Sequence, residues 1–482
     1  MNITKLRTIH QQCASNQRIL LIGGDTVQKT IAQLIGYKLR LPGQSSKSSG
    51  VSTAPVAFSF GWVAFGFSIL LSAVGEMKLM PDNNSRVMVV NCSNAFAKQV
   101  SSWALGRLFR DYQSNHEVDP RPKEEGGRAE SIRIDIFKLG PGPASRPTCD
   151  FVWWLGWSVV LLQLLISVVP WVLYGDWGVM FVTLGGNLLA AITCAMPQWI
   201  EEKWAARPLG MHHRAPFNLF IRRDKVTFLT SGNGGLHIMV FIGAQDSWDL
   251  EALATGTVNP RRETRWVTSA LTALWCCLLV TVSGLQEHSW FLVGIGAIGM
   301  VQNAFAAGTP RSPGASNFHY TKFERAPTII GVREYYKDDS DASVDMKGDL
   351  DELVNVISSS SKSEEAMAEG FFRPTAPKWT DSMSKEDGAP DWLDAIPKKN
   401  GIIHAVGVHG ALMELEKWVP TAGLAMVQIF FPIGLRYMDE SIRDNIHKKF
   451  WKRAYHTQLV RRKAEEKRRA TETRMMAPSQ GP

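Results

Sequence analysis

The chain has 482 residues, which is enough for one membrane domain with soluble segments or for two to three ordinary domains. It carries a formal net charge of +8, and its six cysteines form no CxxC pair and no zinc-finger spacing, so neither a zinc finger nor a disulfide framework is expected. Long apolar runs alternate with charged stretches. The basic balance is therefore better explained by basic flanks that hold loops on the cytoplasmic side of a membrane than by nucleic-acid binding.

Residues 1–54 form a basic N-terminal segment that ends in a Gly/Ser-rich linker. Residues 19–25 resemble a strand leading into a glycine turn, and residues 26–37 are typical of an amphipathic helix. The second half of the GxGxxG fingerprint is missing, so a membrane-proximal helix and turn is favoured over a dinucleotide-binding fold. Residues 1–50 lack the short apolar core of a cleaved signal peptide, and the first span is then the insertion signal.

Five uncharged apolar runs predict a mainly α, polytopic membrane protein with about five transmembrane helices. Each run is close to the ~20 residues that cross a hydrocarbon core of ~30 Å, and many of the tryptophans lie at the ends of runs, where indole rings settle at headgroup depth. The first run is 55–75, and a re-entrant segment is an alternative there. The other four form two hairpins, 151–199 and 266–307, with crossings at 151–174, 177–199, 266–285 and 290–307.

The polar loops at 76–150 and 200–265 predict small α/β elements. A β-hairpin is the clearest of them, with strands at 225–230 and 236–242 around a Ser-Gly-Asn-Gly-Gly turn whose residues accept positive φ. The other expected elements are strands at 85–91 and 132–137, an amphipathic helix at 102–112 and a short acidic helix at 246–254.

The tail has three parts. Residues 308–400 are polar and partly disordered, with a helix expected near 349–357. Residues 401–437 are apolar but interrupted by charges and prolines, which predicts two helices on the membrane or on the spans, with 419–435 as an alternative sixth crossing. Residues 438–482 form a basic tail, in which a helix at 448–469 suits an anionic lipid surface or forms a solvated charged face.

The distribution of Lys and Arg predicts the orientation. Neither hairpin turn carries a basic residue, whereas both polar loops and the tail do, so the loops and the C-terminus are expected in the cytoplasm, in either the plasma membrane or an endomembrane. Five crossings then place the basic N-terminal segment outside, against the rule, and a re-entrant first run removes that conflict. N-glycosylation sequons occur at Asn2, Asn83 and Asn91, of which only Asn2 is luminal with five crossings.

The spans contain no Asp, Glu, Lys or Arg, which argues against an ion-coupled transporter with its relay in these helices. Their polar residues include Gln163, Asn187, Gln302 and Asn303. These amides form either a small polar ligand site between helices or hydrogen bonds that hold the bundle together, and the second reading is favoured.

The glycine turn that contains Gly234, with His237 after it, could bind an anion through backbone N–H groups, although a plain hairpin turn is favoured. His212 and His213 could add imidazoles to His237, but no metal-ligand spacing supports a metal site. No nucleophile elbow, Cys/His set or paired carboxylates appear. The sequence therefore predicts no catalytic residues, no metal and no cofactor.

Six stretches carry a resemblance to known sequences. They are 55–62, 173–178, 197–204 with its Pro-Gln-Trp and Glu-Lys-Trp triplets, 296–303, 411–416 and 430–432. Together they resemble a broad group of uncharacterised multi-pass membrane proteins of filamentous ascomycete fungi. The resemblance implies a fungal source and a multi-span fold, and it brings no activity.

The leading hypothesis is a non-enzymatic membrane protein that works as a scaffold or as a sensor of a membrane-soluble ligand, with the lipid bilayer and unidentified proteins as partners. A transporter or export accessory, with a polar path at Asn187 and Gln302, is one alternative. A membrane-bound enzyme acting on a lipid-soluble substrate near His237 is the other.

Overall fold

The computed structural model describes most of the chain up to residue 332 and a short stretch near the C-terminal end. The described residues are 23–39, 51–74, 78–92, 95–119, 129–142, 146–206, 225–243, 247–258, 261–285, 287–322, 327–332, 401–419 and 422–431. The helix expected near 349–357, the basic helix at 448–469, His212, His213 and Asn2 lie outside these ranges.

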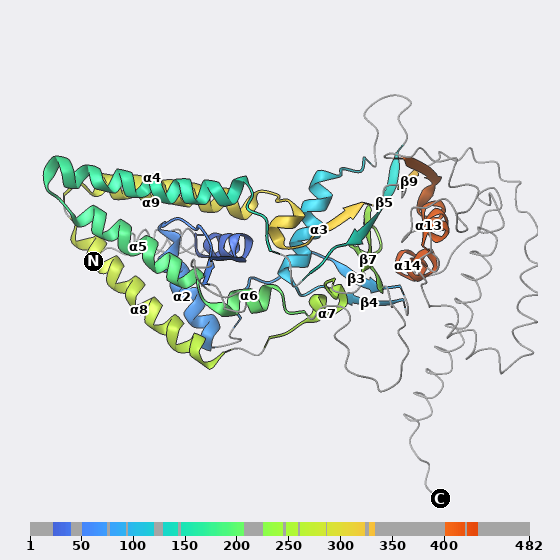
Figure 1. Ribbon diagram of the computed structural model, residues 1–482, viewed down its shortest axis with the longest axis horizontal. Helices are drawn as coiled ribbons and strands as arrows, with labels where there is room; N and C mark the ends of the chain where they lie inside the picture. Colours follow the sequence, from blue (N-terminus) through green and yellow to red (C-terminus); the bar gives the residue numbers. More distant parts are fainter. Residues whose placement is uncertain are drawn as a thin grey trace, which may run out of the picture.

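Long apolar helices make up one half of the molecule (Figure 1). Three of them are long and apolar enough to cross a membrane, or four if the bent pair α5–α6 counts as one span. The expectation of about five crossings is wrong for the described residues. The helices are α4 (Phe151–Tyr174), α5 (Gly178–Cys194), α6 (Pro197–Lys203), α8 (Arg262–Gly284) and α9 (Ser289–Gly308).

The predicted first span does not form a crossing helix. Residues 54–59 have no regular secondary structure, and α2 (Gly61–Val74) has only 14 residues, too few to cross a hydrocarbon core. Ala57 is fully buried, and the Oγ1 atom of Thr272 in α8 donates to the Gly66 carbonyl of α2 at 2.9 Å. The run lies in the bundle first as an irregular segment and then as a short helix, which agrees with the re-entrant alternative.

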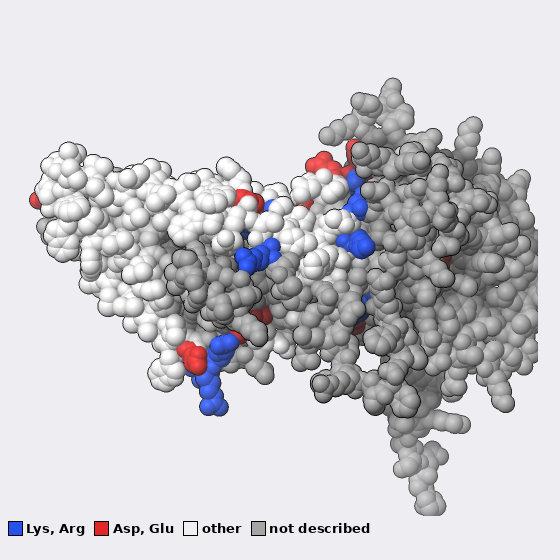
Figure 2. All heavy atoms as spheres, viewed as in Figure 1, with Lys and Arg blue, Asp and Glu red and all other residues white. Residues whose placement is uncertain are grey.

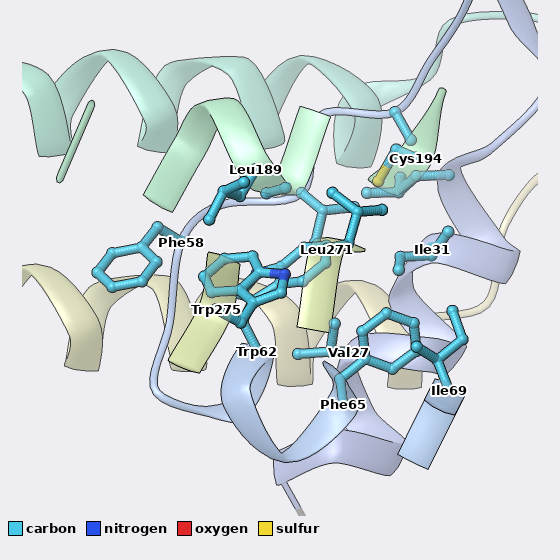
Figure 3. Close-up of a cluster of buried hydrophobic side chains, with 14 of the residues drawn as sticks. Val27, Ile31, Phe58, Trp62, Phe65, Ile69, Leu189, Cys194, Leu271 and Trp275 are labelled. Atoms are coloured by element: carbon cyan, nitrogen blue, oxygen red, sulfur yellow. The ribbon is translucent and has the colours of Figure 1, made fainter. Parts of the chain in front are cut away.

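The helical half has its own apolar core (Figure 3). Side chains from a helix at 23–34, from α2, α5 and α8 meet there, and the rings of Trp62 and Trp275 stack with their centroids 5.3 Å apart. The helix at 23–34 confirms a helix in the region expected at 26–37, but it starts and ends three residues earlier, so Gly23 to Asp25 are helical and do not form the expected glycine turn. Two hairpin turns close the far end of the bundle, where the carboxylate of Asp176 contacts His288 at 3.3 Å.

The polar segments form one sheet. Eight strands join in the order β10-β9-β5-β7-β6-β3-β4, with β8 paired to β5. The pairs β5–β7 and β9–β10 are parallel and the others antiparallel. The strands are β3 (Met88–Asn91), β4 (Phe96–Gln99), β5 (Glu130–Leu139), β6 (Lys225–Thr230), β7 (His237–Gly243), β8 (Tyr320–Lys322), β9 (Thr328–Val332) and β10 (Ile402–Val406), and a separate hairpin pairs β1 (Tyr37–Leu39) with β2 (Val51–Thr53).

The elements expected in the two loops are present, but they are not separate small units. The β6–β7 hairpin is confirmed, and Gly232 and Gly234 in its turn have positive φ. The strands expected at 85–91 and 132–137 correspond to β3 and β5. The two expected helices correspond to α3 (Trp103–Asn115) and to the shorter α7 (Leu250–Thr255).

Helices cover both faces of the sheet. Along β5 the side chains alternate, so that Ile132, Ile134 and Ile136 enter the core under α13 and α14, whereas Phe137 and Leu139 enter the core under α3 and α7. The helices α13 (Gly407–Trp418) and α14 (Ala422–Phe430) follow β10 in the chain.

The expectation that residues 401–437 lie on the membrane or on the spans is wrong for the part that the structure describes. The strand β10 joins the sheet, and α13 and α14 pack on it. With nine residues, α14 does not form a sixth crossing. Glu416 of α13 accepts from the Leu424 N–H of α14 at 3.3 Å, and apolar side chains of both helices fill the core on this face of the sheet.

The chain passes between the two halves repeatedly. The strand β5 precedes the first helical hairpin, β6 and β7 lie between the hairpins, and β8 and β9 follow the second. Strands that are neighbours in the sheet are separated in the sequence by the helical hairpins. The sheet and the helical bundle are therefore expected to assemble together.

Candidate functional site

The four amide side chains of the spans lie together around the irregular segment 54–59. The Nε2 atom of Gln163 in α4 donates to the carbonyls of Phe58 and Ile295, at 2.8 and 2.9 Å. Asn187 in α5 accepts from the Phe58 N–H at 3.2 Å and donates to the Gln163 side-chain oxygen at 3.3 Å. Gln163 therefore hydrogen-bonds to the Phe58 carbonyl, and Asn187 hydrogen-bonds to the Phe58 N–H.

Consecutive residues of α9 do the same for Ala57. The Gln302 side-chain oxygen accepts from the Ala57 N–H at 3.3 Å, and the Asn303 amide nitrogen donates to the Ala57 carbonyl at 3.2 Å. A backbone inside an apolar bundle cannot hydrogen-bond to water, so each such group needs a protein partner. The amides therefore supply the hydrogen bonds that this backbone needs. This agrees with the prediction that they hold the bundle together, although their main partner is segment 54–59 and not another helix.

Two atoms of this cluster keep no partner among the described residues. They are Nε2 of Gln302 and Oδ1 of Asn303, in side chains that are 3% and 1% exposed. A water molecule would satisfy both kinds of atom.

Gly234 and His237 occupy different environments. Gly234 lies in the exposed turn of the β6–β7 hairpin, with φ of +83° and open space where a side chain would be. His237 is buried at the start of β7, and its Nε2 contacts the His116 carbonyl at 2.5 Å. A carbonyl only accepts, so Nε2 carries the proton, and Nδ1 has no partner among the described residues. Burial lowers the pKa of His237, which keeps the ring neutral at neutral pH.

Beside His237 lies a buried carboxylate that the sequence did not single out. Asp135 in β5 accepts from Arg133 at 2.8 Å, Lys322 at 2.9 Å, Thr328 at 2.7 Å and the Tyr112 hydroxyl. Burial opposes the ionisation of Asp135, but hydrogen bonds from Arg133, Tyr112 and Lys322 outweigh it and hold the pKa of Asp135 well below its ordinary value. Both carboxylate oxygens are fully used, which is typical of a carboxylate that ties strands and a helix together.

We expect Asp135→Asn to lower the free energy of unfolding by roughly 2–3 kcal/mol at neutral pH, because the amide leaves two cations short of their anion. The lowered pKa means that the carboxylate stabilises the fold above about pH 4, the ordinary range of Asp, and loses that effect as pH falls toward the folded-state pKa. The difference in Tm between wild type and variant should therefore be constant above about pH 5 and shrink below about pH 4. A constant difference down to the lowest accessible pH would contradict this assignment, and Asp82→Asn, at an exposed ion pair, is the control.

A second charged cluster joins the two halves of the molecule, and we call it the junction. It consists of Gln33, Arg107, Asp111, Asp150, Lys203 and Arg311. The Arg107 guanidinium of α3 donates to the carbonyls of Ala307, Gly308 and Thr309 at the end of α9, at 2.9, 3.0 and 2.6 Å. The sheet's helix α3 thus binds the free carbonyls at one end of a membrane-length helix.

Arg311 and Lys203 complete the junction from the helical side. Arg311 binds both oxygens of Asp150 at 2.6 and 2.7 Å and also donates to the Gln33 carbonyl. The ammonium group of Lys203 lies 2.8 Å from the Ile35 carbonyl, just beyond the helix at 23–34. Asp150 also caps α4 by accepting from the Trp153 N–H at 3.1 Å.

The junction is buried and close to electrically neutral. Arg107 and Arg311 are each 6% exposed and pair with the carboxylates of Asp111 and Asp150. Lys203 is 1% exposed and contacts the carbonyls of Gln33 and Ile35 instead of a carboxylate. The missing negative charge comes from the carbonyl ends of α9 and of the helix at 23–34, each equivalent to about half an elementary charge. Removing any one charged side chain of the junction therefore leaves an uncompensated charge in a buried environment.

Three consecutive residues at the end of α6 each hold a different segment. Glu202 accepts from the N–H groups of Leu79 and Met80 at 2.9 and 2.7 Å, and Lys203 holds the end of the helix at 23–34. The Trp204 indole donates to the Ser316 carbonyl at 3.2 Å, and its ring packs against the core under α3. Since α6 is bent by 47° from α5, it lies between the helical half and the sheet (Figure 1).

The two internal sequon residues use their amide groups within the fold. Asn83 donates to the Val100 carbonyl at 2.8 Å and packs against Gly106 of α3, and Asn91 donates to Glu251 at 2.8 Å. No group of three or more His, Cys, Asp or Glu side chains in the described part of the chain is arranged to hold a metal ion.

Sequence reasoning found the amide cluster and His237 but missed the junction and Asp135. Asp150 directly precedes the first hairpin and Arg311 closely follows the second, so charged residues within a few positions of a span's end are the signal that could have found them. Comparison of the chain with models of protein families, with curated proteins and with solved structures finds no match.

Proposed function

We propose that the chain is an integral membrane protein in which α4, α8, α9 and the bent pair α5–α6 cross the bilayer. The outer surfaces of these helices support this, because side chains such as Leu165, Val280 and Val301 are 69%, 68% and 71% exposed, and an apolar surface of this extent suits lipid rather than water. Figure 2 shows this part of the molecule as almost free of charged side chains, in contrast to the end that faces the sheet.

The sheet lies on the cytoplasmic side in this proposal. The basic residues that precede and follow the crossing helices lie at the sheet end, and the opposite turns carry none. A re-entrant run at 55–74 leaves the end of the helix at 23–34 and the β1–β2 hairpin on the sheet side as well. The described part of the chain then satisfies the charge rule without the conflict that five crossings create.

The function that this arrangement supports best is that of a membrane sensor or scaffold. The observation that carries it is the end of α6, where Glu202, Lys203 and Trp204 tie one bent crossing helix to three other segments of the chain, one of them on the sheet side. A tilt of α5 would move all three together. The four amides do not favour transport, because their hydrogen bonds close the middle of the bundle around segment 54–59 rather than line a path.

A disulfide across the far turns tests the sensor. Asp176 and His288 contact each other there, so we expect Asp176→Cys with His288→Cys to lock the turns when oxidised. Hydrogen exchange of α3 and β5 should then differ between the oxidised and reduced forms of the purified full chain. In a Trp204→Ala background, the difference should fall at least about threefold, because the contact with Ser316 is gone.

Two outcomes would contradict different parts of the proposal. If locking the turns changes no exchange in the sheet although the disulfide forms, the sensor proposal is wrong and a passive scaffold remains. If the chain is released from membranes by alkaline carbonate, the membrane proposal itself is wrong.

A further inference from the structure

A buried histidine on the α3 side of the sheet keeps one ring nitrogen without a protein partner. His237 is 5% exposed and lies beside Arg133, because the two residues are paired in the register of β5 and β7. Its Nε2–H donates to the His116 carbonyl at the end of α3, which leaves Nδ1 as an acceptor. No group in the described part of the chain donates to Nδ1. Buried acceptors are normally hydrogen-bonded, so the donor must come from a ligand or from water.

The charged side chains next to this histidine are positive in sum. The Tyr112 ring lies edge-on to the His237 ring, with the centroids 5.8 Å apart, and its hydroxyl donates to Asp135. The same carboxylate is paired with Arg133 and with Lys322. Two cations therefore share one carboxylate, and both oxygens of that carboxylate are already hydrogen-bonded. A bound anion would offset the remaining positive charge.

The two cations can be reached from solvent, and Arg133 has donors left for an anion. Arg133 forms its ion pair through Nε, and it pairs with no second carboxylate among the residues that the structure describes. The outer two nitrogens of its guanidinium form the planar fork that binds oxyanions with two hydrogen bonds. The side chains of Arg133 and Lys322 are 23% and 30% exposed, whereas His237 lies deeper. An open positive edge thus adjoins a buried acceptor.

We propose that Arg133, Lys322 and His237 bind a small oxyanion that carries its own O–H group, of which inorganic phosphate is the simplest. The two cations bind the charged oxygens, and the O–H group donates to Nδ1 of His237. The site belongs to the sheet, so it does not depend on how the helices lie in a membrane.

Sulfate distinguishes this site from a general anion site. It has nearly the same size and shape as phosphate, but it carries no proton at neutral pH, so one of its oxygens would face the lone pair of Nδ1 on His237. A site that is built to accept a hydrogen bond rejects an analogue without the donor. We therefore expect the site to prefer phosphate to sulfate.

Equilibrium dialysis of the purified full chain in detergent, against radiolabelled phosphate at neutral pH, tests the proposal. Wild type should bind phosphate saturably, unlabelled phosphate should displace it, and an equal excess of sulfate should displace little. His237→Gln should weaken phosphate binding on the order of tenfold or more and let sulfate compete. The glutamine amide can keep the hydrogen bond to the His116 carbonyl but has no acceptor at the position of Nδ1.

Two further variants test the charged side of the site. Arg133→Lys keeps a cation for Asp135 but removes the planar fork, so it should weaken phosphate binding as well. Lys138→Gln removes an exposed cation of the same strand and should bind phosphate as wild type does. The Tm of each variant shows whether it is folded.

The wild-type protein alone can overturn the proposal, whether or not the variants fold. Folded wild type that binds no phosphate saturably, or from which sulfate displaces phosphate as well as phosphate itself does, would contradict the site. Equal binding by wild type, folded His237→Gln and folded Arg133→Lys would show an adventitious ion only.

Discussion

Arg107→Met should lower the free energy of unfolding by roughly 3–5 kcal/mol, because it removes one partner from a buried charge cluster and leaves the others unpaired. The variant deprives the C-terminal end of α9 of three hydrogen bonds and removes the Arg107 guanidinium from Asp111. Methionine keeps much of the volume of the arginine stem, so the loss reflects charge and hydrogen bonding rather than a cavity.

Arg110→Met is the matched control. Arg110 lies on the same helix and also donates to the Gly308 carbonyl, at 3.1 Å, but its side chain is 53% exposed. Exposed pairs are screened by water, so we expect a change below about 1 kcal/mol. Thermal unfolding in one detergent measures both variants, and equal effects would show that burial at the junction contributes nothing.

The junction also explains why hydrogen exchange in the sheet should respond to the helices. Both Arg107 and Asp111 belong to α3, and the backbone N–H of Arg311 donates to Asp111 at 3.1 Å. A shift of the end of α9 changes the partners of these side chains directly. These contacts therefore couple the helical half to the sheet. The Arg107→Met variant should weaken that coupling as well as lower stability.

The helical half could be predicted from the sequence where a run is long and uncharged. Residues 151–174 were expected as one span and form α4 with those bounds. The run at 177–199 was expected as the second span of the hairpin, but Pro197 begins a new helix, α6, because proline at the first helical position favours a start. The run at 55–75 left a crossing helix and a re-entrant segment open, because apolar composition alone does not distinguish a helix from an irregular segment whose backbone is hydrogen-bonded by side-chain amides.

The sheet could be predicted only in pieces. The hairpin at β6 and β7 has its own turn signal, whereas β9 and β10 pair across a long stretch of chain and β5 pairs with β7 across a whole helical hairpin. No local pattern records such pairings. No local pattern predicts the junction either. Its members are spread over the sequence from residue 33 to residue 311, and they meet because the ends of several helices lie close together in the fold.

Gly299→Ala should be the most damaging small substitution in the bundle. A Cβ atom there would lie 1.9 Å from the Phe58 carbonyl oxygen and 2.7 Å from the Gln163 amide nitrogen, so segment 54–59 would have to move. That movement breaks the hydrogen bond that Gln163 makes to Phe58, and we expect a loss of roughly 2–4 kcal/mol in the free energy of unfolding.

Gly294→Ala, in the same helix, is its control. Nothing lies within 4 Å of a Cβ atom at that position, so the added methyl group meets open space and should leave stability unchanged or raise it by up to about 1 kcal/mol. If both variants unfold at the same temperature, the close contact between α9 and segment 54–59 is wrong. If only Gly299→Ala is damaged, the amide-bonded segment is a structural element of the bundle, and a transport path would have to lie elsewhere.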